Sequence, residues 1–328
     1  MSTPTTTYKF SRAGDRWPPL VAAAALLLVF LWTGGMASRH DMIVLTCTYA
    51  LIALGMYIPF VMAGTMSMAY NAYAALGAYG VALIAAHTGL PIWVGWLLGI
   101  IAAVIIAVVL SLATRRLSGF FLAAVTLLFG TAFEYWAGVS KWSGGAGGIG
   151  NIPRVSFFGW EPSRAVQVVM ALVLVWLVTV LVERMRRSPF GATVRAMHEK
   201  RLSVDTGGVK TSTLVTVCLG VGAGIASLGG SLFATFVRGI TPETFTLHVV
   251  FLAIFMPLIG GRLSAWGAVL GAFLVVQLTL NFPWAASGQL ILAIAVLVVM
   301  LAAPGGVLGW IDSAWRFVRR MISKERSA

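Results

Sequence analysis

One carboxylate stands out in this sequence, because Glu134 interrupts an apolar stretch that is long enough to cross a membrane. An ionisable group at the centre of a bilayer costs roughly 2.5–3.5 kcal/mol on insertion scales, which makes it a candidate proton or cation site. Lys141 and Trp142 follow it and are residue types that mark a membrane–water interface. Two interpretations therefore stay open: a functional carboxylate within the membrane, or a side chain that reaches the headgroups from the outer end of its span.

The other reactive side chains do not form a catalytic or metal-binding set. The four histidines show no i, i+4 pairing and have no acidic partner at ligand spacing. Cys47 and Cys218 lie in apolar runs, as inert buried thiols do. No Ser-His-Asp arrangement stands out, and the motif G-x-x-x-x-G-K-[ST] does not occur. We expect no catalytic residue, no metal and no cofactor in this chain, and no Walker-type ATP site.

The composition is that of a protein built to cross a membrane several times. Of the 328 residues 59% are hydrophobic and 10% are charged, whereas soluble domains carry about 25% charged residues. A span needs about 20 apolar residues, and this rule predicts an all-α polytopic membrane protein with about ten transmembrane helices. The predicted spans are 18–36, 42–62, 65–87, 91–113, 119–139, 165–182, 211–236, 246–260, 264–281 and 287–303.

The positively charged residues predict the orientation of these spans across the membrane. With the N-terminus inside, 18 of the 23 Lys and Arg residues fall in inside segments and 5 fall in outside segments. The positive-inside rule therefore predicts that both termini are cytoplasmic. A cytoplasmic segment 1–17 would precede an uncleaved first helix, the transmembrane domain would extend over 18–305, and a basic tail would occupy 306–328. The net charge of +13 then reflects orientation and anionic lipid, and we expect no nucleic-acid partner.

Residues 188–208 form a short basic insert in the cytoplasmic loop 183–210. Ser188 followed by Pro189 is typical of an N-cap and a first helical position. Phe190, Val194 and Met197 recur with helical spacing, which predicts an apolar stripe. Such a stripe must be covered, and the two occupants that we consider are the lipid surface and another protein.

The glycine-rich stretch at 144–150 lies in the predicted external loop 140–164. It is not a phosphate-binding loop, because no Lys-Ser/Thr pair follows the glycines and no strand precedes them. A compact structural turn and a partner-facing surface are its two interpretations.

Five sequence blocks, in this order, resemble the permease subunits of branched-chain amino acid ABC importers, and specifically the LivM-like half of that family. The blocks are GTMSMAYNAYAALGAYGVAL from Gly64, RRLSGFFLAAVTLLFGTAFEY from Arg115, GGAGGIGNIP from Gly144, SPFGATVRAMHEKR from Ser188, and ITPETFTLHVVFLAIFMPLIGGRLSAWGAVLGA from Ile240. Together they extend over roughly residues 50–305. The chain departs from the family pattern at Thr65, at Lys200-Arg201, at 206–208 and at Arg262-Leu263, which affects the expected substrate more than the expected fold.

The resemblance implies a type II ABC importer-like permease that carries a branched-chain amino acid, an amide or a related small polar solute across the bacterial cytoplasmic membrane. It implies ABC ATPase subunits that bind ATP-Mg, a second homologous permease and an external solute-binding protein as partners. The insert would be the coupling helix, with its apolar residues anchored in a groove of the ATPase and its basic residues at the rim. The implied coupling residues are Ser188, Pro189, Phe190, Gly191, Val194, Arg195, Met197, Glu199, Lys200 and Arg201.

A candidate substrate path follows from the same blocks and from the polar residues in the spans. Its residues are Ser67, Asn71, Tyr79, Thr126 and Glu134. Interhelical hydrogen bonding is the other role that we consider for polar groups such as Asn71, Gln277 and Asn281. The competing function is an ion-coupled secondary transporter that uses Glu134.

Overall fold

The computed structural model describes residues 37–115, 119–153, 162–281, 306–307 and 309. Eight of the ten predicted spans fall in these ranges, and each contains a helix. The predicted spans 18–36 and 287–303, the predicted segment 1–17 and most of the predicted tail 306–328 lie outside the described residues. The long helices are α2 (Ala37–Tyr57), α3 (Tyr70–His87), α4 (Ile92–Thr114), α5 (Gly119–Val139), α6 (Arg164–Arg187), α9 (Thr211–Val237), α10 (Leu247–Gly260) and α11 (Ala265–Asn281).

Among the described residues, six helical stretches are long and apolar enough to cross a membrane. They correspond to α2 with the π-helical turn η1 (Ile58–Met62), to α4, α5, α6 and α9, and to α10 with the short helix η4 (Pro242–Phe245) before it. The fold is therefore a helical multi-pass membrane bundle.

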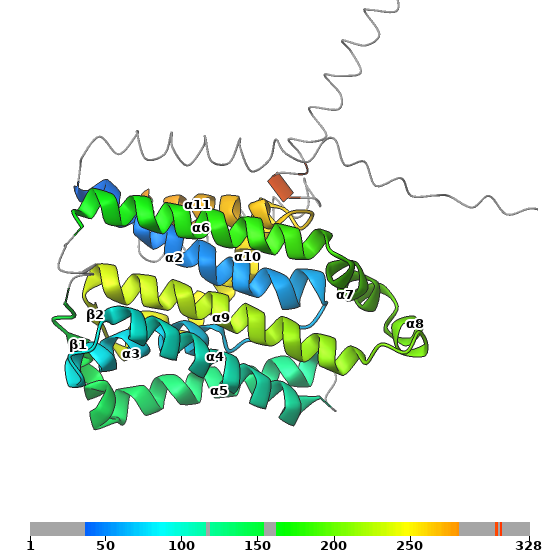
Figure 1. The fold of residues 1–328 in the computed structure, drawn as a ribbon, viewed down its shortest axis with the longest axis horizontal. Helices are drawn as coiled ribbons and strands as arrows, with labels where there is room; N and C mark the ends of the chain where they lie inside the picture. The colour runs from blue at the N-terminus through cyan, green and yellow to red at the C-terminus, as the bar shows by residue number, and fades with distance from the viewer. Residues whose placement is uncertain (1–36, 116–118, 154–161, 282–305, 308, 310–328) are drawn as a thin grey trace, which may run out of the picture.

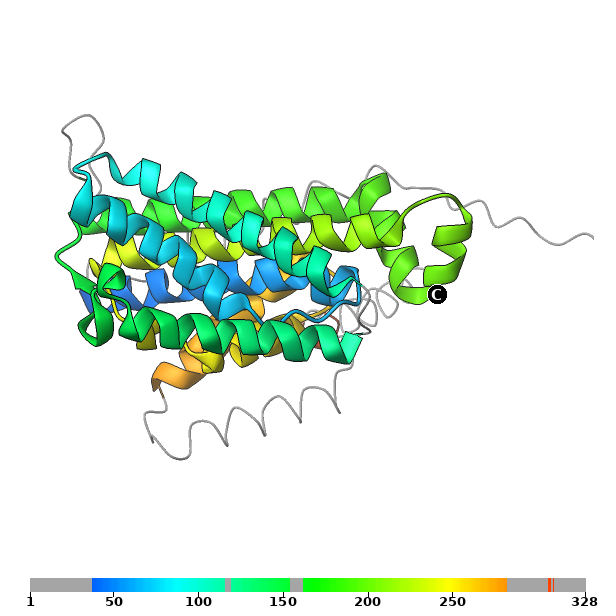
Figure 2. The ribbon, with the colours of Figure 1, turned by 90° about the horizontal axis from the view of Figure 1, so that it is seen from below.

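The helices run roughly side by side along the long axis of the molecule (Figures 1 and 2). In Figure 1, α6 and α11 lie on one side, α3, α4 and α5 lie on the other, and α9 passes between them. Two short helices, α7 (Pro189–Glu199) and α8 (Arg201–Thr206), extend beyond one end, which we call the insert end. Residues 140–153 and 238–246 gather at the opposite end, which we call the loop end.

Helices α2 and α9 form the centre of the bundle. In the most apolar 18-residue stretch of each helix, the buried share is 78% for α2 and 72% for α9, against 28% for both α4 and α5. The outer helices keep large apolar side chains on their exposed faces, such as Leu97 on α4, Leu128 on α5 and Leu181 on α6. This distribution is expected where lipid replaces water around a bundle, since lipid tails solvate exposed leucines.

Glycine allows the central helices to touch backbone to backbone. A Cβ atom at Gly230 of α9 would collide with the carbonyl oxygen of Ala74 on α3, and one at Gly77 would collide with that of Ser227. Small residues permit this close approach, which is a main source of packing energy between helices in lipid.

The loop end is closed by a small antiparallel pairing between β1 (Ile149–Gly150) and β2 (Gly239–Ile240). Ile149 pairs with Ile240 and Gly150 with Gly239. Positive φ angles at Gly144, Gly145 and Gly148 form the turns that precede β1, around the short helices η2 (Lys141–Ser143) and η3 (Gly145–Gly147). The glycine-rich stretch is therefore a compact structural turn, which is one of its two interpretations.

The predicted span 65–87 is wrong at its start. The chain leaves the helical conformation after η1 and becomes helical again only at Tyr70. Gly64 has φ +65°, in the left-handed region that favours glycine. Residues 63–69 are thus an irregular segment between two helices, which an apolar run alone does not reveal.

The contact of Gly230 with α3 gives a stability prediction. Gly230→Ala should lower the thermal unfolding midpoint of the detergent-solubilised protein, because overpacking a close contact typically costs about 1–3 kcal/mol. Gly138→Ala is the matched control, since Gly138 also lies in a helix but a Cβ there would meet no atom within 4 Å. Equal midpoints for the two variants would contradict the backbone contact between α3 and α9.

Candidate functional site

The insert begins as its sequence predicts. Ser188 is the N-cap of α7, its Oγ accepts a hydrogen bond from the backbone N–H of Gly191 at 3.3 Å, and Pro189 occupies the first turn. The insert is not one continuous helix, because Lys200 leaves the helical conformation with φ −143° and ψ 79° and separates α7 from α8. Gly207 and Gly208 end α8, as expected from their types.

The apolar stripe of α7 faces the body of the same chain. Val194 is 0% exposed and Met197 is 4% exposed, and both belong to the core cluster that contains Met62 and Ala63. Phe190 is partly buried against the same cluster. The expectation that Val194 and Met197 anchor the insert in a groove of another protein is therefore wrong for this structure. The stripe has its cover within the chain, and neither lipid nor a partner is needed to bury it.

The opposite face of the insert is open. The exposed residues of the insert are Pro189, Ala192, Ala196, His198, Glu199, Lys200, Arg201, Leu202, Ser203, Asp205, Thr206, Gly207 and Gly208. Of these, His198 lies against Gly64 of the body. Leu202 is 78% exposed, which is unusual for a leucine outside the lipid-facing helices. Arg195 lies between the two faces, and its guanidinium donates to the backbone carbonyl of Arg186 at 2.6 Å. Of the predicted coupling residues, Glu199, Lys200 and Arg201 are thus available to a partner, whereas Gly191, Val194 and Met197 are buried.

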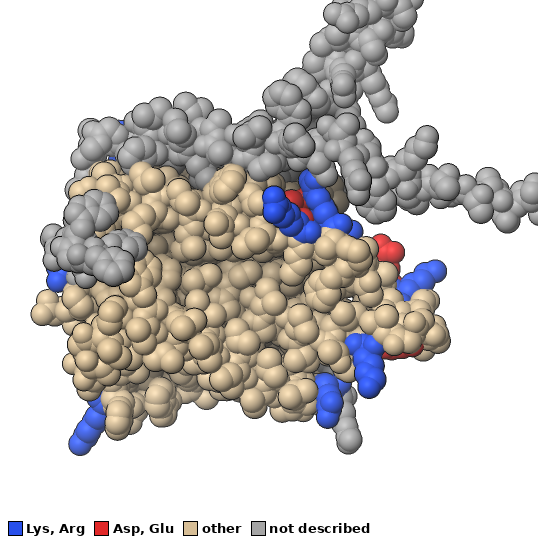
Figure 3. Space-filling model, viewed as in Figure 1, with Lys and Arg blue, Asp and Glu red and all other residues tan. Residues whose placement is uncertain are grey.

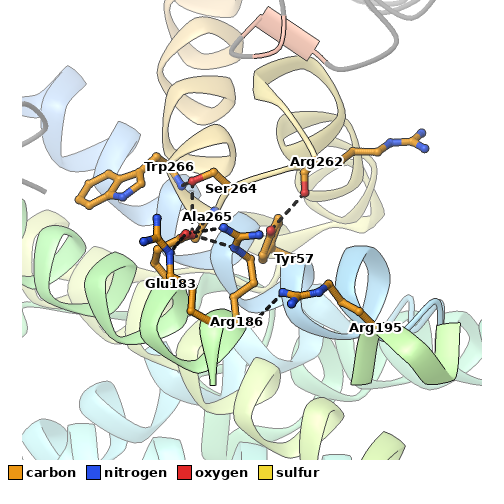
Figure 4. Close-up of polar contacts among 9 residues, drawn as sticks. Tyr57, Glu183, Arg186, Arg195, Arg262, Ser264, Ala265 and Trp266 are labelled. Atoms are coloured by element: carbon orange, nitrogen blue, oxygen red, sulfur yellow. Dashed lines mark hydrogen bonds and ion pairs between the residues drawn. The ribbon is translucent and has the colours of Figure 1, made fainter. Parts of the chain in front are cut away.

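A buried carboxylate lies directly behind the insert (Figure 4). Glu183, in the last turn of α6, has a side chain that is 9% exposed. Its Oε1 accepts from Arg186 at 2.6 Å and from Arg187 Nε at 2.8 Å. Its Oε2 accepts from Arg186 Nε at 3.1 Å, from Ser264 Oγ at 3.3 Å and from the backbone N–H of Ala265 at 3.1 Å. We call these five residues the Glu183 junction.

The Glu183 junction connects the end of α6 with the loop between α10 and α11. Close to it, the Tyr57 hydroxyl at the end of α2 donates to the carbonyl of Arg262 at 3.1 Å. Gly191 packs directly on the carbonyl oxygens of Met185 and Arg186, where a Cβ would collide with both. Four segments, from α2, α6, α7 and the α10–α11 loop, therefore meet at the insert end.

Sequence reasoning did not single out Glu183. A signal was available in the sequence E-R-M-R-R at the end of an apolar span, where the i+3 and i+4 positions carry arginine. A carboxylate in the last turn of a helix opposes the helix dipole, so partners elsewhere in the chain were to be expected. Ser264 and Ala265 are 81 and 82 residues away in sequence, and no local pattern could identify them.

The predicted path residues Ser67, Asn71 and Thr126 lie together at the seam between the irregular segment with α3 and helix α5. The backbone N–H of Met68 donates to Thr126 Oγ1 at 2.8 Å, and Asn71 Nδ2 donates to the carbonyl of Gly130 at 3.2 Å. Thr126 is seven residues into α5, about 10 Å from its start. Irregular backbone at such a depth is tolerated where protein or a water-filled cavity surrounds it.

This seam contains polar atoms that lack hydrogen-bond partners among the described residues. They are the Ser67 hydroxyl, with Ser67 0% exposed, and the carbonyl oxygen of the Asn71 side chain, with Asn71 1% exposed. The hydroxyl of Tyr79, two turns further along α3, is buried without a partner as well. Buried polar groups are nearly always paired, so the seam is distinguished by polar atoms whose hydrogen-bonding capacity is unused.

Glu134 lies one helical turn beyond Gly130 on α5, toward the loop end. It is half-buried on α5, five residues before the helix ends, and its charge interacts with that of Glu243 on η4. Of its two interpretations, the geometry favours a side chain at the end of its span. On the face shown in Figure 3, uncharged residues cover the middle of the bundle, and Lys and Arg residues gather at the insert end.

Comparison with known proteins agrees with this architecture. The family model of the branched-chain amino acid transport system permease component matches residues 38–312. The high-affinity branched-chain amino acid transport system permease protein LivM of Escherichia coli is 27% identical over 317 residues, covering 88% of this chain and 74% of its own length. LivM of Salmonella typhimurium is 26% identical over 312 residues, covering 87% and 73%.

A shorter match, 28% identical over 141 residues, is to a probable branched-chain amino acid transport permease protein LivM of Methanocaldococcus jannaschii. No match to a solved structure was found. These relatives confirm the expectation of a membrane permease subunit of an ABC importer, and none supports the ion-coupled secondary transporter. Since the family model extends over most of the chain, this protein belongs to the family of branched-chain amino acid transport system permease components.

Proposed function

We propose that this permease moves a branched-chain amino acid, or a related small polar solute, across the bacterial inner membrane, with energy from separate ATPase subunits. The observation that carries the proposal is the insert, whose apolar stripe is fixed to the body while its polar face remains open at one end of the bundle. A helix held in this way can transmit a displacement from a partner protein to the bundle, as coupled conformational change requires.

The insert end is the cytoplasmic end in this proposal. The charge asymmetry of the sequence supports it, with 18 of 23 Lys and Arg residues in inside segments. The full domain then has ten spans within 18–305, a cytoplasmic coupling loop at 183–210, an external loop at 140–164 and cytoplasmic segments at 1–17 and 306–328. Both termini are cytoplasmic.

The ATPase contacts the open face of α7 and α8. The interface uses Ala192, Ala196 and Glu199 on α7, Lys200 between the two helices, and Leu202 on α8. Small residues let a partner approach the helix closely, and Leu202 supplies an apolar anchor between charged neighbours. ATP-Mg is bound by the partner and not by this chain. A second homologous permease and an external solute-binding protein complete the importer.

Ser67, Asn71 and Thr126 belong to the solute path, with Tyr79 and Glu134 toward its external end. The unpaired atoms of Ser67, Asn71 and Tyr79 support this assignment. A zwitterionic or amide solute offers the donors and acceptors that these atoms lack, and the surrounding apolar helices suit an aliphatic side chain.

The proposal is tested by purification of the tagged chain from its native membrane in mild detergent, followed by reconstitution with its co-purified subunits and solute-binding protein. We expect an ATPase and a second permease among those subunits, and we expect uptake of radiolabelled leucine that requires ATP inside the vesicles. Uptake driven by a proton gradient without ATP, or a chain that purifies alone while a known ABC complex survives, would contradict the proposal.

The open face of the insert gives a binding prediction. Leu202→Asp should weaken ATPase binding by about tenfold or more, because truncation of an anchor at an interface commonly costs over 1 kcal/mol. Leu263→Asp is the matched control, because Leu263 is also exposed at this end, at 67%, but lies outside the insert. The ATPase retained on the immobilised permease is measured, and equal retention by the two variants would exclude Leu202 as an anchor.

The buried stripe gives a prediction about folding. Val194→Asp and Met197→Asp should reduce the amount of folded permease in the membrane, because each places an unpaired charge in the core. Ala196→Asp, on the open face of the same helix, should leave this amount unchanged. Fluorescence-detected size-exclusion chromatography measures the folded fraction, and normal profiles for Val194→Asp and Met197→Asp would show that the stripe is not buried.

A further inference from the structure

Glu183 lies near the C-terminal end of α6 and contacts a second, distant segment of the chain. It lies in the last turn of α6, where the partial negative charge of the helix end repels it. The same carboxylate lies at the first turn of α11, where it accepts the backbone N–H of Ala265 at 3.1 Å. The positive end of the α11 dipole and the two arginines together favour the ionised form. The two arginines stabilise the charge from within α6, and the contacts with Ser264 and Ala265 add to this only while α6 and α11 stay together.

The insert is attached to this junction from one side. Arg195 of α7 donates to the carbonyl of Arg186 at 2.6 Å, and Arg186 also bonds both oxygens of Glu183. Gly191 lies against the same carbonyl, so the first turn of α7 has no freedom to slide over the end of α6. A displacement of α7 must therefore displace Arg186 and, with it, the Glu183 carboxylate.

The α10–α11 hairpin is attached from the other side. Gly260 and Gly267 are in such close contact that a Cβ on Gly260 would collide with the Gly267 carbonyl, and Gly271 packs in the same way on the carbonyl of Met256. The two helices of the hairpin therefore move as one body. Ser264 and Ala265, at its turn, are the residues that Glu183 holds.

We propose that Glu183 is the positioning residue that transmits a displacement of the insert to the α10–α11 hairpin. The hairpin packs along α2, and its helix α10 also packs against α3, in the core cluster that contains Ala69, Tyr70 and Tyr79. A shift at its turn therefore reaches the core around the proposed solute path. Glu183 touches neither ATP nor the solute, and it acts through Arg186 on one side and through the first turn of α11 on the other. This inference rests on the proposed function, because it presumes that the insert receives the motion of an ATPase.

The test compares Glu183→Gln with wild type in the complete reconstituted complex, using radiolabelled leucine as the probe. Gln keeps the size of the side chain but loses the charge that holds both arginines. The readout is the number of ATP molecules hydrolysed per leucine taken up, which a change in the amount of folded complex does not alter. We expect this ratio to rise by about fivefold or more, the lower end of typical coupling strengths.

Arg184→Gln is the matched control. Arg184 lies in the same turn of α6 and is exposed, and it is not part of the Glu183 junction. Its ratio should equal that of wild type. If Glu183→Gln also keeps the wild-type ratio, and uptake and ATP hydrolysis fall together, Glu183 is only a structural residue and the inference is overturned.

A second variant keeps the inference testable if Glu183→Gln does not assemble. Ser264→Ala removes one contact of the carboxylate and leaves both arginine pairs in place. It should raise the ratio in the same direction, by about twofold or more, and an unchanged ratio would overturn the inference. Absence of ATP-driven leucine uptake by the wild-type complex would instead overturn the proposed function itself.

Discussion

The structure depends on one constraint, which is that the apolar stripe of α7 must be buried. The chain meets it internally, by placing Val194 and Met197 in the core that also contains the end of the α2–η1 stretch. This contact fixes the insert to the bundle and determines which of its faces remains open. It also brings Arg195 to the end of α6, where its guanidinium donates to the backbone carbonyl of Arg186, a member of the Glu183 junction. If the stripe faced outward, the open face would not exist in its present form and the insert would not be attached to the junction in this way.

The bundle itself shows two kinds of interaction that suit a lipid environment. Close backbone contacts at Gly77 and Gly230 hold α3 and α9 together where there is no hydrophobic effect between helices to do so. Between α3 and α5 the interface is different, since it contains the irregular segment 63–69 and polar atoms without partners.

Much of this architecture is predictable from the sequence, for local reasons. The Ser188-Pro189 cap, the glycine stop of the insert and the presence of a helix in eight of the ten predicted spans follow from residue type and from runs of apolar residues. Six helical stretches among the described residues are long and apolar enough to cross a membrane. The helical period of Phe190, Val194 and Met197 correctly predicts an apolar stripe. It does not tell which surface covers the stripe, because the covering residues lie more than a hundred residues away. For that reason the sequence did not show that Val194 and Met197 are covered by the chain itself.

Other features of the site lie beyond local patterns as well. The start of α3 at Tyr70 depends on the left-handed conformation of Gly64 and on a long-range hydrogen bond. In this bond the backbone N–H of Met68 donates to the side chain of Thr126, 58 residues away. The role of Glu183 depends on Ser264 and Ala265, and a count of positive residues gives no reason to notice it. Of the predicted path residues, the structure brings Ser67, Asn71 and Thr126 together, but it places Glu134 nearer to Glu243 at the loop end. Their transport role stays a prediction.

The most direct measurement of the central claim is the rate at which a membrane-impermeant maleimide labels single cysteines on the two faces of α7 in inside-out vesicles. The two native cysteines, Cys47 and Cys218, are both buried and give a low background. The account predicts fast labelling of Ala196→Cys, which bound ATPase subunit slows, and little labelling of Met197→Cys with or without the ATPase. Fast labelling of Met197→Cys that the ATPase blocks, together with slow labelling of Ala196→Cys, would show that the stripe faces the partner and would contradict the account.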